Sequence, residues 1–149
     1  MFVVLMADDD EDDCILVKAA FEEMGLSPDL HFVSDGRELL DYVRNDGHFA
    51  DPVKYPRPDV ILLDLNMPRL NGREALPLIK SDPKLRDIPV LVLTTSREEH
   101  DVALSKQAGA ASFLSKPEAF EDLRDMLQSF CTAIIHNRNV PFQVLGCDR

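Results

Sequence analysis

Short runs of apolar residues alternate along this chain with segments in which apolar residues recur every three or four positions. The first run, Phe2 to Ala7, ends at a row of acidic residues, and apolar residues then recur at helical spacing between Ile15 and Phe21. A short continuous apolar run is typical of a buried strand, and the second pattern is typical of a helix with one apolar face. The chain is therefore predicted to begin with a strand and a helix.

The same unit recurs along the rest of the chain. Further strands are predicted at Leu30 to Val33, Val60 to Leu63, Val90 to Leu93 and Ser112 to Ser115. Helical patterns follow around Leu39 to Val43, after Asn71-Gly72, from about Glu98 to Ala108 and from Phe120 to Phe130. Strands that alternate with helices indicate a parallel sheet covered on both faces. We predict an α/β, doubly wound (βα)5 flavodoxin-like parallel sheet with strand order 2-1-3-4-5.

Breaker residues and chain length suggest one domain. The segment from Asp46 to Pro58 is polar and rich in Gly and Pro, which predicts an irregular loop, and Pro77 should shorten or kink the third helix. A chain of 149 residues suits one domain. We expect a domain over residues 1–135 and a C-terminal tail over 136–149, packing on the domain or on a dimer partner.

Charge and hydropathy exclude two classes of partner. The net charge of -11 would repel phosphate backbones, so binding to nucleic acid is not expected. No apolar run approaches the roughly 20 residues that span a bilayer, so no membrane segment is expected. The three cysteines form no close pair, which favours a reduced, cytoplasmic setting.

Polar residues follow several of the predicted strands. Because the carboxyl ends of parallel strands meet at one edge of a sheet, these residues should lie on a common rim. They are Asp8 and Asp9 after the first strand, Asp64 after the third, Thr94 after the fourth and Lys116 after the fifth. In the order 2-1-3-4-5 the first and third strands are neighbours, which brings three carboxylates together.

This cluster predicts metal-assisted phosphoryl chemistry. Three carboxylates repel one another unless a hard cation lies between them, and Mg2+ suits a site of carboxylates, a carbonyl and water. A carboxylate such as Asp64 can attack phosphorus to form an aspartyl phosphate. Lys116 could offer a cation, and Thr94 a hydroxyl, to two oxygens of the phosphoryl group.

Read together, these residues resemble the receiver domain of two-component response regulators. The resemblance rests on Asp8-Asp9, on Asp64-Leu65-Asn66-Met67-Pro68, on Thr94 and on Phe113 with Lys116-Pro117. Arg57 to Pro68, Asn71 to Glu74 and Val92 to Ser96 look like the stand-alone subclass associated with bacterial phytochromes. In place of the Glu-Asp-Asn-Pro usual in that subclass, this chain has Asp8-Asp9-Asp10-Glu11.

The resemblance implies a role for each residue of the set. Asp64 would be the phosphoacceptor, and Asp8, Asp9, Asp64 and the Asn66 carbonyl would hold Mg2+. Lys116 and Thr94 would contact the phosphoryl group, and Thr94 and Phe113 would form the switch. The family also favours a cis bond before Pro117.

The same resemblance implies a setting and partners. A histidine kinase would donate the phosphoryl group from a phosphohistidine, and the resemblance to the subclass points to a phytochrome-type photoreceptor as that kinase. The receiver would catalyse only its own phosphotransfer and dephosphorylation, so it is not expected to be an enzyme with an independent substrate. The fourth helix, fifth strand, fifth helix and tail form the face through which a homodimer is conceivable.

Other interpretations of these residues stay open at this point. Asp10, Glu11, Asp12 and Asp13 suit the start of a helix, where Asp10 is a good N-cap and acidic residues favour the helix dipole. A phosphorylation-independent dimeric binding module is the main alternative function. A phosphatase of the haloacid-dehalogenase type is disfavoured, because Asp12 stands where that family needs Thr or Val.

Overall fold

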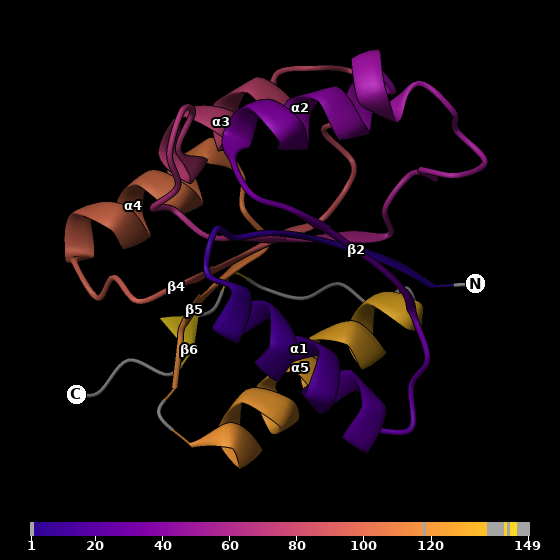
Figure 1. The fold of residues 1–149 in the computed structure, drawn as a ribbon. Helices are drawn as coiled ribbons and strands as arrows, with labels where there is room; N and C mark the ends of the chain where they lie inside the picture. Colours follow the sequence, from indigo (N-terminus) through magenta and orange to yellow (C-terminus); the bar gives the residue numbers. More distant parts are fainter. Residues whose placement is uncertain (1, 118, 137–141, 143, 146–149) are drawn as a thin grey trace.

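The computed structural model describes residues 2–117, 119–136, 142 and 144–145. A parallel sheet runs through the middle of the molecule and helices cover both of its faces (Figure 1). The strands are β1 (Val3–Ala7), β2 (Asp29–Val33), β3 (Val60–Leu63), β4 (Val90–Thr94), β5 (Ser112–Ser115) and β6 (Val144–Leu145). The helices are α1 (Glu11–Glu23), α2 (Gly36–Arg44), the 3-10 helix η1 (Gly47–Phe49), α3 (Gly72–Lys80), α4 (Glu99–Ala108) and α5 (Phe120–Ile135).

The strands lie in the order β2-β1-β3-β4-β5-β6 and pair in parallel. The predicted order 2-1-3-4-5 is thus confirmed. The short strand β6 was not predicted, and it pairs with β5 through Phe113 and Leu114. Ala7 is paired with Leu63, so β1 and β3 end side by side and deliver the residues that follow them to one edge of the sheet.

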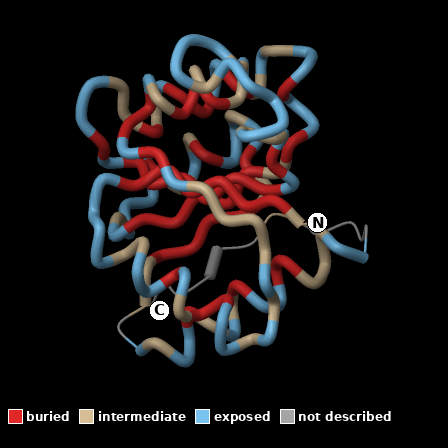
Figure 2. The backbone as a smooth tube through the Cα atoms, turned by 45° about the vertical axis from the view of Figure 1, so that its right-hand side comes forward, coloured by how far each residue is buried: buried red, intermediate tan, exposed pale blue. Residues whose placement is uncertain are grey.

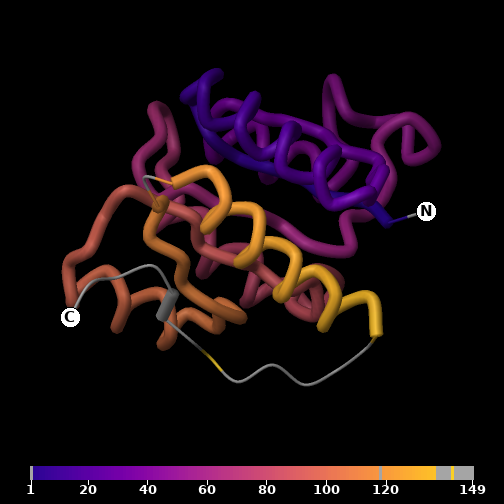
Figure 3. The backbone as a smooth tube through the Cα atoms, turned by 90° about the horizontal axis from the view of Figure 1, so that it is seen from below, coloured from indigo at the N-terminus to yellow at the C-terminus, as the bar shows by residue number. Residues whose placement is uncertain are grey.

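Each face of the sheet has its own hydrophobic core. Helices α2, α3 and α4 cover one face, and α1 and α5 lie side by side on the other (Figures 1 and 3). Along β1, Leu5 belongs to the first core, whereas Val4 and Met6 belong to the second, as expected from the alternation of side chains along a strand. Figure 2 shows the buried residues gathered in the middle of the molecule, where β1, β3, β4 and β5 are buried along their whole length and the edge strand β2 is only partly buried.

Side-chain caps fix the points at which the first three α-helices begin. Asp10 accepts a hydrogen bond from the backbone N–H of Asp12, which confirms it as the N-cap of α1. Asp35 caps α2 in the same way. Asn71 and Glu74 form a reciprocal capping box at the start of α3. The caps follow directly from local sequence and place each helix at a fixed distance from the preceding strand.

The segment between α2 and β3 is an irregular loop, as predicted, and it folds back on α2. The Tyr42 hydroxyl donates to the carbonyl of Pro56 at 2.9 Å, and the Asn45 side-chain amide donates to the carbonyls of Phe49 and Tyr55. Rings of Tyr42, Phe49 and Tyr55 pack edge to face or tilted against one another. The loop is therefore a packed part of the domain and not a linker.

The proline inside α3 does not end that helix. Helix α3 continues through Pro77 to Lys80, and the Lys80 ammonium donates to the carbonyls of Arg86 and Ile88 beyond the helix.

In the part of the chain that is described, no helix has the length and apolar character needed to cross a membrane. The predicted tail over 136–149 lies mostly outside the described residues.

Candidate functional site

The acidic residues that follow β1 and β3 converge at the sheet edge. Asp8, Asp9 and Asp64 each offer one carboxylate oxygen within 4.8 Å of the other two. Asp8 and Asp64 are only 3% and 7% exposed, whereas Asp9 is open to solvent. The cluster is therefore open to solvent at Asp9, whereas Asp8 and Asp64 lie in the interior of the protein.

Asp8 is a buried acid held by two hydrogen bonds. Its two oxygens accept hydrogen bonds from the Asp10 backbone N–H at 2.9 Å and from the Lys116 ammonium at 2.8 Å. Burial nevertheless raises the pKa of the Asp8 carboxyl to about 6, because the loss of hydration outweighs the hydrogen bonds and Asp64 adds repulsion. The ionised form of Asp8 is therefore disfavoured mainly by its burial.

Lys116 reaches across the site from the end of β5. Its ammonium lies 2.8 Å from Asp8, 2.6 Å from Asp13 and 3.7 Å from Asp64. Burial alone would lower the pKa of Lys116, but the hydrogen bonds to Asp13 and Asp8 hold that pKa above its ordinary range. The lysine is a fixed positive charge beside Asp64 and is hydrogen-bonded to Asp8 and Asp13.

Gly72 supports the backbone of Asp64. A Cβ atom on Gly72 would lie 2.2 Å from the Asp64 carbonyl oxygen, well inside contact distance. The Gly72 N–H donates to the carbonyl of Leu65, and the Asn66 N–H faces one Asp64 carboxylate oxygen at 3.3 Å. The absence of a side chain at Gly72 therefore allows α3 to start directly against the candidate phosphoacceptor.

The remaining predicted residues lie around this centre. Thr94 is fully buried at the end of β4, where its hydroxyl oxygen accepts from the Ser96 N–H at 3.4 Å. Phe113 is fully buried in the core on the face of the sheet that α2, α3 and α4 cover. Asn66 is exposed, and its backbone carbonyl stays a predicted metal ligand. The described residues include no cis peptide bond, so the expected cis bond before Pro117 is wrong for this structure.

Two interactions at the site were missed in the sequence. Asp13 was assigned only to the start of a helix, yet its carboxylate binds Lys116, which is 103 positions away. Arg73 was noted only as part of a motif, yet it forms a two-pronged ion pair with the buried Asp101. Each contact joins residues distant along the chain, so no local pattern could have revealed it.

The donor set fits a hard divalent cation. All the grouped side-chain donors are carboxylate oxygens, the type of ligand that Mg2+ and Mn2+ take in proteins. Three carboxylates whose oxygens lie within 4.8 Å of one another repel when ionised, and a cation would relieve this repulsion. Asp9 leaves the site open on its solvent side.

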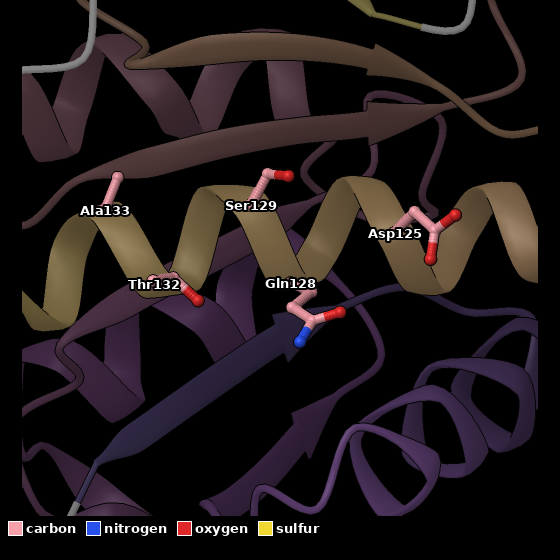
Figure 4. A pocket seen from close by; sticks show the side chains of 5 residues that line it. All are labelled: Asp125, Gln128, Ser129, Thr132 and Ala133. Carbon is pink, nitrogen blue, oxygen red and sulfur yellow. The ribbon is translucent and has the colours of Figure 1, made fainter.

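A shallow pocket elsewhere does not compete with this site. Its lining side chains all come from successive turns of α5 (Figure 4). They are Asp125, Gln128, Ser129, Thr132 and Ala133. None of them is a predicted site residue, and none belongs to the grouped acids at the sheet edge.

Known proteins support the same interpretation. The family model of the response regulator receiver domain matches residues 4–128. The response regulator Rcp1 of Synechocystis is 36% identical over 126 residues, which cover 85% of this chain and 84% of Rcp1. A probable methanogenesis regulatory protein, FilR2 of Methanothrix harundinacea, is 37% identical over 83% of this chain and 77% of its own length.

Solved structures agree with the sequence relatives. A response regulator in red light signalling of R. palustris superposes with a TM-score of 0.86 at 33% identity, covering 95% of this chain and 99% of that one. The phosphorylated cyanobacterial phytochrome response regulator RcpA gives a TM-score of 0.83 at 32% identity, with the same coverage. A Mn2+-bound form of Rcp1 gives 0.82 at 33% identity, again with that coverage. The chain therefore belongs to the response regulator receiver domain family of two-component signalling, and stand-alone phytochrome response regulators are among its homologues.

Proposed function

We propose that this chain is a single-domain response regulator in which Asp64 accepts a phosphoryl group from a phosphohistidine of a sensor histidine kinase. The observation that carries the proposal is the grouping of Asp8, Asp9 and Asp64 within 4.8 Å, with the Lys116 ammonium 3.7 Å from Asp64. Of these acids, Asp64 is the one that Lys116 approaches without a hydrogen bond, which leaves its carboxylate available for a new bond.

Four residues would hold the metal. Asp8, Asp9 and Asp64 would supply carboxylate oxygens, and Asn66 its backbone carbonyl. Bound Mg2+ would offset the charge on the transferring phosphoryl oxygens. A Mn2+-bound form of the relative Rcp1 supports the choice of a divalent cation.

Asp64 and Lys116 would perform the transfer. An Asp64 carboxylate oxygen bonds to phosphorus as the bond from phosphorus to the kinase imidazole nitrogen breaks, and that nitrogen keeps the electron pair. Lys116 pairs with one phosphoryl oxygen, and the Thr94 hydroxyl donates to another. Hydrolysis later returns Asp64 to a carboxylate, so the domain catalyses only steps on its own phosphoryl group.

The output would be a population shift. If the phosphorylated state favours one arrangement of Thr94 and Phe113, the face built from α4, β5 and α5 changes its contacts with a partner or a second copy. The domain would comprise residues 1–135, with the tail at 136–149 on the domain or on a dimer partner. The likeness to the phytochrome response regulator RcpA supports a phytochrome-type kinase as the partner, and the absence of a close cysteine pair in the sequence favours a cytoplasmic setting.

Intact mass after incubation with acetyl phosphate tests the proposal. We expect one added phosphoryl group that requires Mg2+ and is absent from Asp64→Asn. Asp59→Asn is a matched control, because Asp59 binds the Val3 N–H near the opposite ends of the strands. Absence of Mg2+-dependent labelling in the wild-type protein would favour the phosphorylation-independent dimeric binding module instead.

A further inference from the structure

A chain of polar contacts runs from the candidate phosphoacceptor to the candidate switch residue. The Asn66 N–H faces Asp64 at 3.3 Å, and the Asn66 side-chain oxygen accepts from the Arg73 guanidinium at 2.9 Å. Arg73 in turn binds Asp101. These contacts connect the loop after β3 to the first turn of α4.

The remaining contacts of this series lie in the loop after β4. The Ser96 hydroxyl donates to Asp101 at 2.5 Å, and the Ser96 N–H donates to the Thr94 hydroxyl oxygen at 3.4 Å. Thr94 and Asp64 follow the adjacent strands β4 and β3. The contacts therefore form an open series that ends at Asp64 on one side and at Thr94 on the other.

The centre of this series is the ion pair of Arg73 with the buried Asp101. Asp101 is 1% exposed, and its two oxygens receive Arg73 nitrogens at 2.7 and 2.8 Å in a fork geometry. Arg73 lowers the pKa of Asp101 to about 2, with a further contribution from Ser96, so this carboxylate is charged in the working pH range. Bidentate ion pairs of this kind are strong and directional, so the Arg73–Asp101 pair is a rigid connection.

The Arg73–Asp101 pair connects the loop after β3 with the loop after β4. Arg73 also reaches the carbonyl of Leu65 at 3.4 Å, so one guanidinium holds the loop after β3 through two residues. Asp101 holds the loop after β4 through Ser96. If either member of the pair were lost, each loop would be free to move away from the other.

We propose that Arg73 and Asp101 are positioning residues that brace these loops around the phosphorylated Asp64 and thereby slow its hydrolysis. In that step a water oxygen bonds to phosphorus as the bond between phosphorus and the Asp64 oxygen breaks. Asp64 regains its carboxylate, and the water proton leaves with inorganic phosphate or to solvent. The inference rests on the proposed function, and it assigns to α3 and α4 the control of how long the phosphoryl group lasts.

The test follows loss of the phosphoryl group from the full chain. The protein is labelled with Mg2+ and acetyl phosphate, the donor is removed, and intact mass is recorded over time. Asp101→Asn breaks the ion pair, and Ser96→Ala keeps the pair but removes its link to the second loop, together with the acceptor of the Glu98 N–H. Arg124→Gln is the matched control, because Arg124 forms an ion pair with Glu23 that connects α5 to α1, outside this series of contacts.

We expect the phosphoryl group to be lost about fivefold faster from Asp101→Asn, with a smaller increase for Ser96→Ala and none for Arg124→Gln. Circular dichroism at the assay temperature establishes that each variant is folded, so a merely structural role would leave the decay unchanged. If Asp101→Asn does not fold, Ser96→Ala decides.

The possible failures are distinguishable. Labelled wild-type protein with equal or slower decay in the variants overturns the bracing role and leaves the proposed function intact. A wild-type chain that takes up no phosphoryl group overturns both.

Discussion

The Lys116 ammonium lies 2.6 Å from a carboxylate oxygen of Asp13, the shortest of its contacts with the surrounding acids. Asp13 is in the first turn of α1, whereas Lys116 follows β5. Before phosphorylation, the cation assigned to the phosphoryl group is thus hydrogen-bonded to a residue outside the proposed metal site. Capture of a phosphoryl group by Lys116 competes with this contact.

Substitution of Asp13 should therefore alter phosphorylation. We expect Asp13→Asn to weaken the hold on Lys116 and to speed labelling by acetyl phosphate about threefold, the equivalent of less than about 1 kcal/mol in the barrier. The pKa of Lys116 should fall toward its ordinary range, because one of the hydrogen bonds that raise it loses its charge. Time courses of intact mass measure the rate. Asp12→Asn, an exposed neighbour, is the control, and equal rates for the two variants would contradict the competition.

Gly72→Ala should disturb the backbone of the phosphoacceptor Asp64. The new methyl group would meet the Asp64 carbonyl oxygen at 2.2 Å, so either α3 or the backbone of Asp64 must move. We expect a loss of about 1–3 kcal/mol in the free energy of unfolding, the usual cost of overpacking. Gly36→Ala is a matched control, since its methyl group would meet the Leu70 carbonyl oxygen at the same 2.2 Å. Both should be destabilised, but only Gly72→Ala should be phosphorylated more slowly when folded; equal labelling would exclude the supporting role.

Asp8→Asn should stabilise the protein in the absence of metal. Raising the pKa of Asp8 from 3.8 to about 6 corresponds to a stability loss on the order of 3 kcal/mol above pH 6. The protonated form contributes its full stability below about pH 4, and this is lost as the pH rises through about 6. Urea unfolding in a chelator should show the gain of Asp8→Asn at pH 7 and its disappearance near pH 4. A gain that grows as the pH falls would contradict the assignment.

Asp101→Asn should show the opposite pH dependence. Because the pKa of Asp101 is lowered from 3.8 to about 2, the charged form contributes on the order of 2 kcal/mol above about pH 4, and this is lost as the pH falls through about 2. Urea unfolding of the wild type and Asp101→Asn should therefore differ most at neutral pH and converge in acid. Ser105→Ala, which removes only a hydrogen bond to the Asp101 carbonyl, should leave a difference from the wild type that does not vary with pH.

Features that depend on neighbouring residues were predictable from the sequence. The apolar run from Phe2 to Ala7 marks β1 because both faces of a central parallel strand are buried, and Asp10 marks the start of α1 because its cap acts two positions away. Grouping of Asp8 with Asp64 followed from strand order. The contact of Asp13 with Lys116 could not be predicted, because it depends on how closely α1 approaches the end of β5.

The same limit applies to strand ends and to short pairings. Thr94 belongs to β4, where its partner across the ladder is Ser115, although the apolar run ended one residue earlier. A strand as short as β6 carries too few residues for periodicity to identify it. The pairing of Lys80 with backbone carbonyls beyond α3 likewise has no signature in the sequence.

The pairing of β6 with β5 restricts how two copies of this domain can associate. A sheet edge left open offers unpaired N–H and C=O groups on which another chain can build a continuous intermolecular sheet. Here the backbone of Phe113 and Leu114 on that edge already faces Val144 and Leu145 of the same chain. Strand addition from a second molecule to β5 would first have to displace this segment, so a backbone ladder between copies that leaves β6 in place has to form at β2 or at β6 itself.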